Sequence, residues 1–201
     1  MTALINAVMC LIQREFAIEE PTWQKIALPV ADFSFLQKEC NTQSEFDPHN
    51  VRKGLLDKLR DNSVFMTTMH CKYGQVCAIL DQQQMKEMPW GLWGRILRLY
   101  SERTKQTEQT ETPFKPFKPF KIFFLANKHL RQFPESLLPI QSIHINGGYT
   151  YSCNHETIVI YRAEDATRVL IHELQHSCCL DKRIHSTDII EANTEAWAEL
   201  L

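Results

Sequence analysis

Apolar residues recur every three to four positions in some stretches of the chain and every second position in others. The first spacing is typical of amphipathic helices, and the second is typical of strands with one buried face. In the first half of the chain the pattern predicts helices over residues 1–16, 50–61 and 91–103, and strands over residues 63–70 and 75–81. No stretch of this half carries a recognisable chemical motif.

The second half of the chain has a simple order of strand, turn, strand and helix. Residues 143–152 and 157–162 are rich in β-branched and aromatic residues, which favours two strands, and a helix is expected directly after them. A last helix is expected over 186–201, with Asp188 as N-cap and Glu191 three residues later, as in a capping box. Together these elements predict an α+β fold with a small mixed sheet.

The stretch HELQH in the first of these two helices places His172 and His176 four residues apart. Four residues are close to one helical turn, so both imidazoles can aim at one point. A catalytic zinc site needs one further His, Asp or Glu and keeps its fourth position for water. Glu195, which follows His176 after a gap of 18 residues, and Glu199 lie one turn apart on the last helix. They are candidate carboxylates for such a site.

This pattern resembles the gluzincin branch of the zincin metallopeptidases, in which a glutamate on the next helix completes the site. The resemblance implies that His172, His176 and Glu195 bind one Zn²⁺ per chain and that Glu173 is the catalytic general base. It also implies that Glu199 orients a ligand histidine. The implied fold is zincin-like, and the implied activity is zinc-dependent hydrolysis of a peptide or related amide bond in a peptide or protein substrate.

By the same resemblance, an edge strand above the metal would pair with an extended substrate backbone. Its residues would be Gly147, Gly148, Tyr149 and Thr150. Glycine suits such a place because another backbone can approach it closely, although a Gly-Gly pair also occurs at simple bends. No motif marks the group that stabilises the transition state, and the candidates are Tyr149 and His185.

Composition narrows the classes of partner. The chain is 44% hydrophobic and 23% charged, as in an ordinary globular protein, and its formal net charge of -2 gives no indication of nucleic-acid binding. No run approaches the roughly 18 apolar residues of a membrane span. Seven cysteines, with Cys178 and Cys179 adjacent, do not form the pattern of a disulfide framework. We therefore expect a reducing compartment, a cytoplasmic location and no signal peptide.

A polar stretch with a short repeat divides the chain. Residues 105–120 form a predicted linker between a mixed helical and strand region over 1–104 and a metallopeptidase core over 121–201. Residues 113–121 read PFKPFKPFK, and the proline spacing favours polyproline II, which sorts Pro, Phe and Lys onto three edges. Either this segment docks into an SH3-like partner, or it is a semi-rigid spacer.

Two other functions fit the same sequence. One is a zinc-binding interaction module that has the ligands without catalytic turnover, and the other is an adaptor that acts through residues 113–121 with its helices as a scaffold. Only the metallopeptidase needs Glu173 as a base. This residue therefore separates the three hypotheses.

Overall fold

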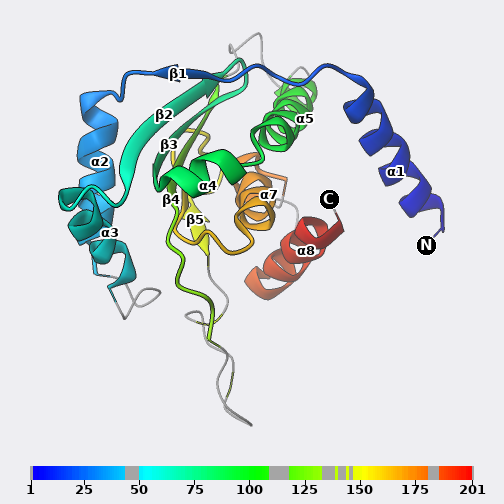
Figure 1. Ribbon diagram of the computed structural model, residues 1–201. Coiled ribbons are helices and arrows are strands. Elements are labelled where there is room, and N and C mark those ends of the chain that lie inside the picture. Colours follow the sequence, from blue (N-terminus) through cyan, green and yellow to red (C-terminus); the bar gives the residue numbers. More distant parts are fainter. Residues whose placement is uncertain are drawn as a thin grey trace.

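The computed structural model describes residues 2–43, 50–108, 118–132, 139, 144, 147–180 and 186–200. These residues form seven helices and six strands (Figure 1). In chain order the elements are α1 (Thr2–Ala17), β1 (Gln24–Ile26), α2 (Val30–Asn41), α3 (Val51–Arg60), β2 (Phe65–Cys71), β3 (Gly74–Leu80), α4 (Gln82–Glu87), α5 (Trp90–Glu108), β4 (Phe120–Leu125), β5 (Gly148–Thr150), β6 (Ile158–Ile160), α7 (Ala166–Ser177) and α8 (Thr187–Leu200). The predicted mixture of helices and strands around a mixed sheet is confirmed.

The six strands form one sheet in the order β1-β2-β3-β4-β6-β5. β3, β4 and β6 are parallel neighbours at its centre, whereas β1, β2 and β5 pair antiparallel. β4 is apolar at almost every position because helices cover both faces of a central parallel strand. β5 is the last strand at one edge, and α7 follows its neighbour β6 along the chain.

Helices cover both faces of this sheet (Figure 1). α2 and α3 lie on one face, where Phe35 stacks on Phe123 with ring centroids 4.1 Å apart. α5 and α7 lie on the other face, where Trp93 packs against Phe124 at 5.5 Å. Phe123 and Phe124 are neighbours in β4 and point to opposite faces, as strand geometry requires. The protein therefore has two cores that share one sheet.

Two helices lie outside these layers (Figure 1). α8 packs on α7, and α1 packs on α5. Arg98 of α5 donates from Nε to Glu15 Oε1 at 2.5 Å, and Arg95 donates to the carbonyl oxygen of Ile18 at 2.8 Å. Both arginines also donate to the carbonyl oxygen of Glu15 in the last turn of α1, where carbonyl groups have no partner within the helix. None of the described helices combines the length and the apolar character needed to cross a membrane.

The predicted boundary near residue 105 falls between two neighbouring strands of the sheet. β3 comes from the predicted N-terminal region and β4 from the predicted core, and they pair from Gly74–Phe120 to Ile79–Leu125. Residues 109–117, which hold most of the repeat and of the linker, lie outside the described residues. Phe120, the last phenylalanine of the repeat, is fully buried in β4. This side chain is therefore part of the core and does not face an SH3-like partner.

Two glycines at the start of β5 allow α7 to pack directly on the edge strand. A Cβ added to Gly148 would lie 2.8 Å from Val169 Cγ1 and 2.6 Å from the carbonyl oxygen of Val159. A Cβ added to Gly147 would lie 2.8 Å from Val169 Cγ2. From the sequence, these glycines were expected to let a substrate backbone approach the edge strand. The close approach in the structure is that of α7.

We expect Gly148→Ala to destabilise the fold by about 1–3 kcal/mol, because the atom it meets on Val159 is backbone that is fixed in the sheet. Gly54→Ala in α3 is the matched control. No atom lies within 4 Å of its added Cβ, and alanine favours a helix, so stability should rise by about 0.5–1 kcal/mol. Urea unfolding measures both changes. A stabilising Gly148→Ala would contradict the close packing of α7 on β5.

Candidate metal centre

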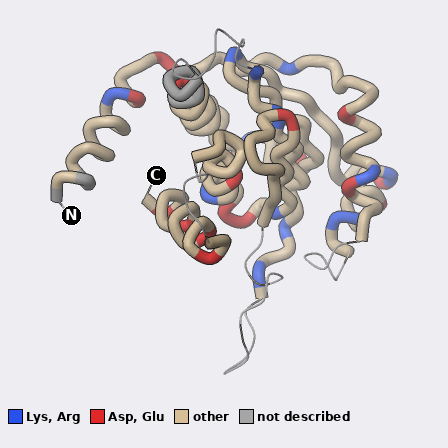
Figure 2. Tube along the Cα trace, turned by 180° about the vertical axis from the view of Figure 1, so that it is seen from behind, with Lys and Arg blue, Asp and Glu red and all other residues tan. Residues whose placement is uncertain are grey.

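α7 and α8 face each other through two stripes of polar side chains. The stripe on α7 is Arg168, His172 and His176, and the stripe on α8 is Glu191, Glu195 and Glu199. Residues four apart share a helix face. Arg168 contacts Glu199 and His176 contacts Glu191, so the contacts run in opposite order and the helices are antiparallel. α8 carries acidic residues and no basic one, as Figure 2 shows.

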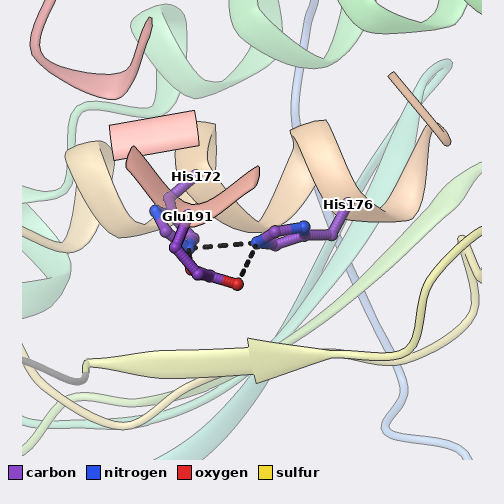
Figure 3. Close-up of side chains that lie close together, drawn as sticks. All are labelled: His172, His176 and Glu191. Carbon is purple, nitrogen blue, oxygen red and sulfur yellow. Dashed lines mark hydrogen bonds and ion pairs between the residues drawn. The ribbon is translucent and has the colours of Figure 1, made fainter. Parts of the chain in front are cut away.

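The two histidines and Glu191 meet at one point between the helices (Figure 3). The Nε2 atoms of His172 and His176 are 3.2 Å apart. One carboxylate oxygen of Glu191 lies 3.3 Å from His172 Nε2, and the other lies 3.6 Å from His176 Nε2. The histidine side chains are 19% and 14% exposed, whereas that of Glu191 is 52% exposed. Solvent therefore reaches this cluster from the side of Glu191.

The types of the three side chains and the spacing of the two histidines fit a zinc ion. Ligand atoms about 2.0–2.2 Å from zinc at tetrahedral angles are about 3.3–3.6 Å from one another. The two Nε2 atoms, 3.2 Å apart, match this spacing. Glu191 contacts the two histidines through different carboxylate oxygens, and one ligand atom from each of the three residues lies within 4.8 Å of the others. Two imidazoles and one carboxylate are also the ligands of many catalytic zinc sites, which keep the fourth position open. Within the described residues, this is the one group of three metal-ligating side chains that converges.

The structure places Glu191, rather than Glu195, in the group of side chains that could hold a metal ion. From the sequence, Glu191 was expected to form a capping box with Asp188. The N–H of Ile190 donates to the carbonyl oxygen of Ser186 at 3.0 Å, so the helix starts earlier than expected. Asp188 therefore lies within the first turn, and the carboxylate of Glu191 is directed at the histidines.

Glu195 contacts the other ring nitrogen of His172, with its Oε2 2.8 Å from Nδ1. A carboxylate at the second nitrogen of a ligand histidine fixes the ring orientation and makes the ligand nitrogen more basic. Glu195 is itself paired with Arg168, whose Nε lies 3.5 Å from Glu199. Glu195, and not Glu199, therefore contacts His172 within the described residues, and Glu199 contacts Arg168.

Glu173 is buried beside the cluster, with 6% of the residue exposed. It lies on the side of α7 that packs on β5, since a Cβ on Gly148 would be 3.4 Å from its Cγ. Burial raises the pKa of its carboxyl group to about 7, against the opposing charges of His172 and His176. A carboxyl group that titrates near neutral pH can both accept and return a proton, which is what a general base must do.

The cluster also shifts the pKa values of two of its own members. Hydrogen bonds from His172 and His176 hold the pKa of Glu191 well below its ordinary value of 4.5. Burial lowers the pKa of His172, but the hydrogen bond to Glu191 and the charge of Glu173 outweigh burial and raise it above 6.5. Both shifts favour a protonated His172 paired with an ionised Glu191, which joins α7 to α8.

Tyr149 points away from the cluster, which corrects its predicted role as transition-state stabiliser. Successive residues of a strand face opposite sides, and because Gly148 faces α7, Tyr149 packs in the core under α2 and α3. Burial and the negative charge of Glu39, its hydrogen-bond partner, raise the pKa of its hydroxyl group. His185, the other candidate, lies outside the described residues.

Three of the four predicted edge residues form the edge strand β5, and Gly147 directly precedes it. The N–H of Tyr161 donates to the carbonyl oxygen of Gly147 at 2.8 Å, so these two residues form a hydrogen-bonded antiparallel pair. Hydrogen-bonded pairs alternate along an antiparallel ladder, which turns the backbone groups of Gly148 and Thr150 to the outer side of β5. These groups are the ones that an added strand would use.

A disulfide bond joins Cys153, in the turn between β5 and β6, to Cys179, just after α7. The N–H of Cys153 also donates to the carbonyl oxygen of His176 at 2.9 Å. The sequence showed no pattern of a disulfide framework, and the structure pairs two of the seven cysteines while the other five are not in a disulfide. Cys178 is buried and not in a disulfide, as expected of a small core residue.

Comparisons of the chain with protein-family models, curated proteins and solved structures found no match.

We expect Glu191→Gln to raise the dissociation constant for Zn²⁺ by more than about 100-fold, because it removes a charged ligand. Glu195→Gln should raise it by about 10- to 100-fold, because it removes only the contact that orients His172. Glu102→Gln, on the exposed surface of α5, should change nothing. Titration against a competing zinc chelator at neutral pH measures all three. A larger loss for Glu195→Gln would return the ligand role to Glu195.

The ion pair of the metal-free cluster predicts a pH window for stability. The lowered pKa of Glu191 gives stability that is present above pH 4.5 and lost as the pH falls further. The raised pKa of His172 gives stability that is present below pH 6.5 and lost as the pH rises through the folded-state pKa. Both contributions are present between these values. Since Glu191 is half-exposed, they amount to about 1 kcal/mol or less.

Thermal unfolding in the presence of a chelator should therefore show the largest difference between wild type and Glu191→Gln between pH 4.5 and 6.5. The difference should shrink on both sides of this window. A difference that is constant from acid to alkaline pH would contradict the ion pair.

Proposed function

We propose that this protein is a zinc-dependent metallopeptidase that hydrolyses peptide or related amide bonds. The observation that carries the proposal is the convergence of His172, His176 and Glu191, whose ligand atoms lie within 4.8 Å of one another. Histidines that only fill a core would not need a facing stripe of carboxylates, and Glu195 and Arg168 extend the contact between the helices. Buried Glu173 supplies the base that hydrolysis requires.

Zinc bound by these side chains would supply a Lewis acid, which lowers the pKa of water and polarises a carbonyl group. Glu173 accepts the proton of the attacking water and donates it to the nitrogen of the bond that breaks. The carbonyl carbon gains the oxygen of water as its bond to nitrogen breaks, so the products are a carboxylate and an amine. Glu195 and Arg168 keep the ring of His172 in its orientation during this exchange.

The zincin-like part of the proposal rests on the order of elements. An edge strand, its antiparallel neighbour, the HExxH helix and a helix with carboxylates follow one another as β5, β6, α7 and α8. The outward backbone groups of Gly148 and Thr150 offer an extended peptide a strand to pair with, and α7 packs directly on this strand. The substrate class is therefore a peptide or an unfolded protein segment.

Glu173→Gln should leave zinc affinity within a few-fold of wild type and reduce cleavage by at least about 100-fold, because the amide cannot accept the proton. Zinc content by mass spectrometry and cleavage of a peptide library measure the two properties separately. Glu87→Gln, an exposed carboxylate on α4, is the control and should cleave like wild type.

Each other outcome would support a different function or mechanism. Zinc binding without cleavage by wild type would identify the non-catalytic zinc module. Cleavage by Glu173→Gln at the wild-type rate would remove Glu173 as the base. Absence of zinc from wild-type protein supplied with the metal would overturn the proposal as a whole.

A further inference from the structure

Arg131 lies near the start of the edge strand β5 and near the start of α7. After β4 the chain crosses toward α7, and the backbone N–H of Arg131 donates to Glu164 Oε2 at 2.7 Å. The guanidinium Nη1 pairs with Asp165 Oδ2 at 2.8 Å, and Asp165 is the N-cap residue of α7. A Cβ on Gly147 would lie 3.2 Å from Nη2, so the guanidinium also borders the first residue before β5.

The guanidinium of Arg131 is not fully satisfied. Its side chain is 7% exposed, and within the described part of the chain its Nε and Nη2 atoms are buried with no hydrogen-bond partner. Buried polar groups of folded proteins are almost always hydrogen-bonded, and an unpaired buried cation is costly. Asp165 is half-exposed and occupies only Nη1. The remaining donors lie in the fork geometry that binds a carboxylate through two parallel hydrogen bonds.

The start of α7 adds positive potential at the same place. α7 is 12 residues long, and the Asp165 side chain accepts no hydrogen bond from its first turn, because it is turned to Arg131. The N–H groups of a helix start favour an anion. A buried arginine with unpaired donors and a helix start without a side-chain cap therefore lie together at one end of β5.

The distance between Arg131 and the metal centre corresponds to a number of residues along an extended substrate. Asp165 precedes His172 by seven residues, which is about 10 Å along a helix. An extended peptide covers about 3.3 Å per residue, so this distance corresponds to about three residues. β5 runs from the Arg131 end toward the turn that contacts His176. Antiparallel pairing, the more stable arrangement, would bring the C-terminal side of a bound peptide to Arg131.

We propose that Arg131 binds a carboxylate of the substrate about three residues to the C-terminal side of the bond that is cut. This inference rests on the proposed peptidase function. The carboxylate is either the free C-terminus of a peptide or the side chain of an aspartate or glutamate, since both present the same pair of oxygens to the guanidinium. Arg131 thereby selects the substrate and sets the position of the cut.

The test uses two random libraries of acetylated decapeptides, one with a free C-terminal carboxylate and one with a C-terminal amide. Wild-type protein loaded with zinc is incubated with each, and mass spectrometry identifies the cut bonds. Cuts should be enriched about 10- to 100-fold where a carboxylate lies about three residues to the C-terminal side, the range for hydrogen bonds to a charged group. Enrichment only in the free-acid library identifies the C-terminus, and enrichment for Asp or Glu in both identifies the side chain.

Three variants test the role of Arg131 itself. Arg131→Gln should abolish the enrichment. Asp165→Asn leaves Nη1 available to the ligand and should increase the enrichment, an opposite change that a folding defect cannot mimic. Arg60→Gln, on exposed α3, is the matched control and should retain the wild-type preference.

The negative outcomes are distinguishable. Cleavage of both libraries without any preference for a carboxylate, or the same preference in Arg131→Gln, would overturn the inference and leave the proposed function intact. Cleavage of neither library by zinc-loaded wild type would overturn the proposed function, and this inference with it.

Discussion

The pairing of two partly buried histidines on α7 with carboxylates on α8 is the interaction on which the rest of the site depends. α8 buries only Thr194 and Ala198, so it brings little apolar surface to the fold. Ile189, Trp197 and Leu200 are exposed, and the polar stripe joins α8 to α7 through several ion pairs. A metal ion in the cluster would therefore stabilise the attachment of α8 directly, because binding free energy at such a site is also folding free energy.

The sheet holds the other side of the site in place. The side chain of Tyr149 in β5 is hydrogen-bonded to Glu39. Glu39 in turn pairs with Arg52 at 3.2 Å in the core under α2 and α3. The same strand presents Gly148 to α7 on its opposite face. A buried polar network on one face and close helix packing on the other therefore fix β5 relative to Glu173. The N-terminal half of the chain contributes to the site through this network, although it supplies no ligand.

Local patterns predicted much of the architecture. Apolar periodicity located the main helices and strands, and the four-residue spacing of His172 and His176 placed both imidazoles on one face. The place of Glu191 beside the two histidines was harder to predict, because Asp188 and Glu191 also satisfy a capping box. The signal that identifies Glu191 is the match between two stripes, each with four-residue spacing, on antiparallel helices. To recognise this match, one needs the relative position of α7 and α8, which the local sequence does not determine.

Contacts between distant segments could not be predicted from local sequence for the same reason. The bond between Cys153 and Cys179 joins residues 26 positions apart, and an odd number of cysteines gave no pairing. Arg131 meets Asp165 only because the chain after β4 crosses to the start of α7. Phe120 belonged to a repeat that favoured an exposed segment, and the parallel pairing of β4 with β3 buries it instead. In each case tertiary packing decided between two locally acceptable structures.

The most direct test of the metal centre is anomalous X-ray diffraction at the zinc absorption edge, from crystals of the wild-type protein grown with zinc. We predict one strong peak about 2.0–2.2 Å from the Nε2 atoms of His172 and His176 and from a carboxylate oxygen of Glu191. Glu195 should remain at Nδ1 of His172. A crystal with zinc in solution and no peak at this cluster, or a peak bound by Glu195 in place of Glu191, would contradict the account.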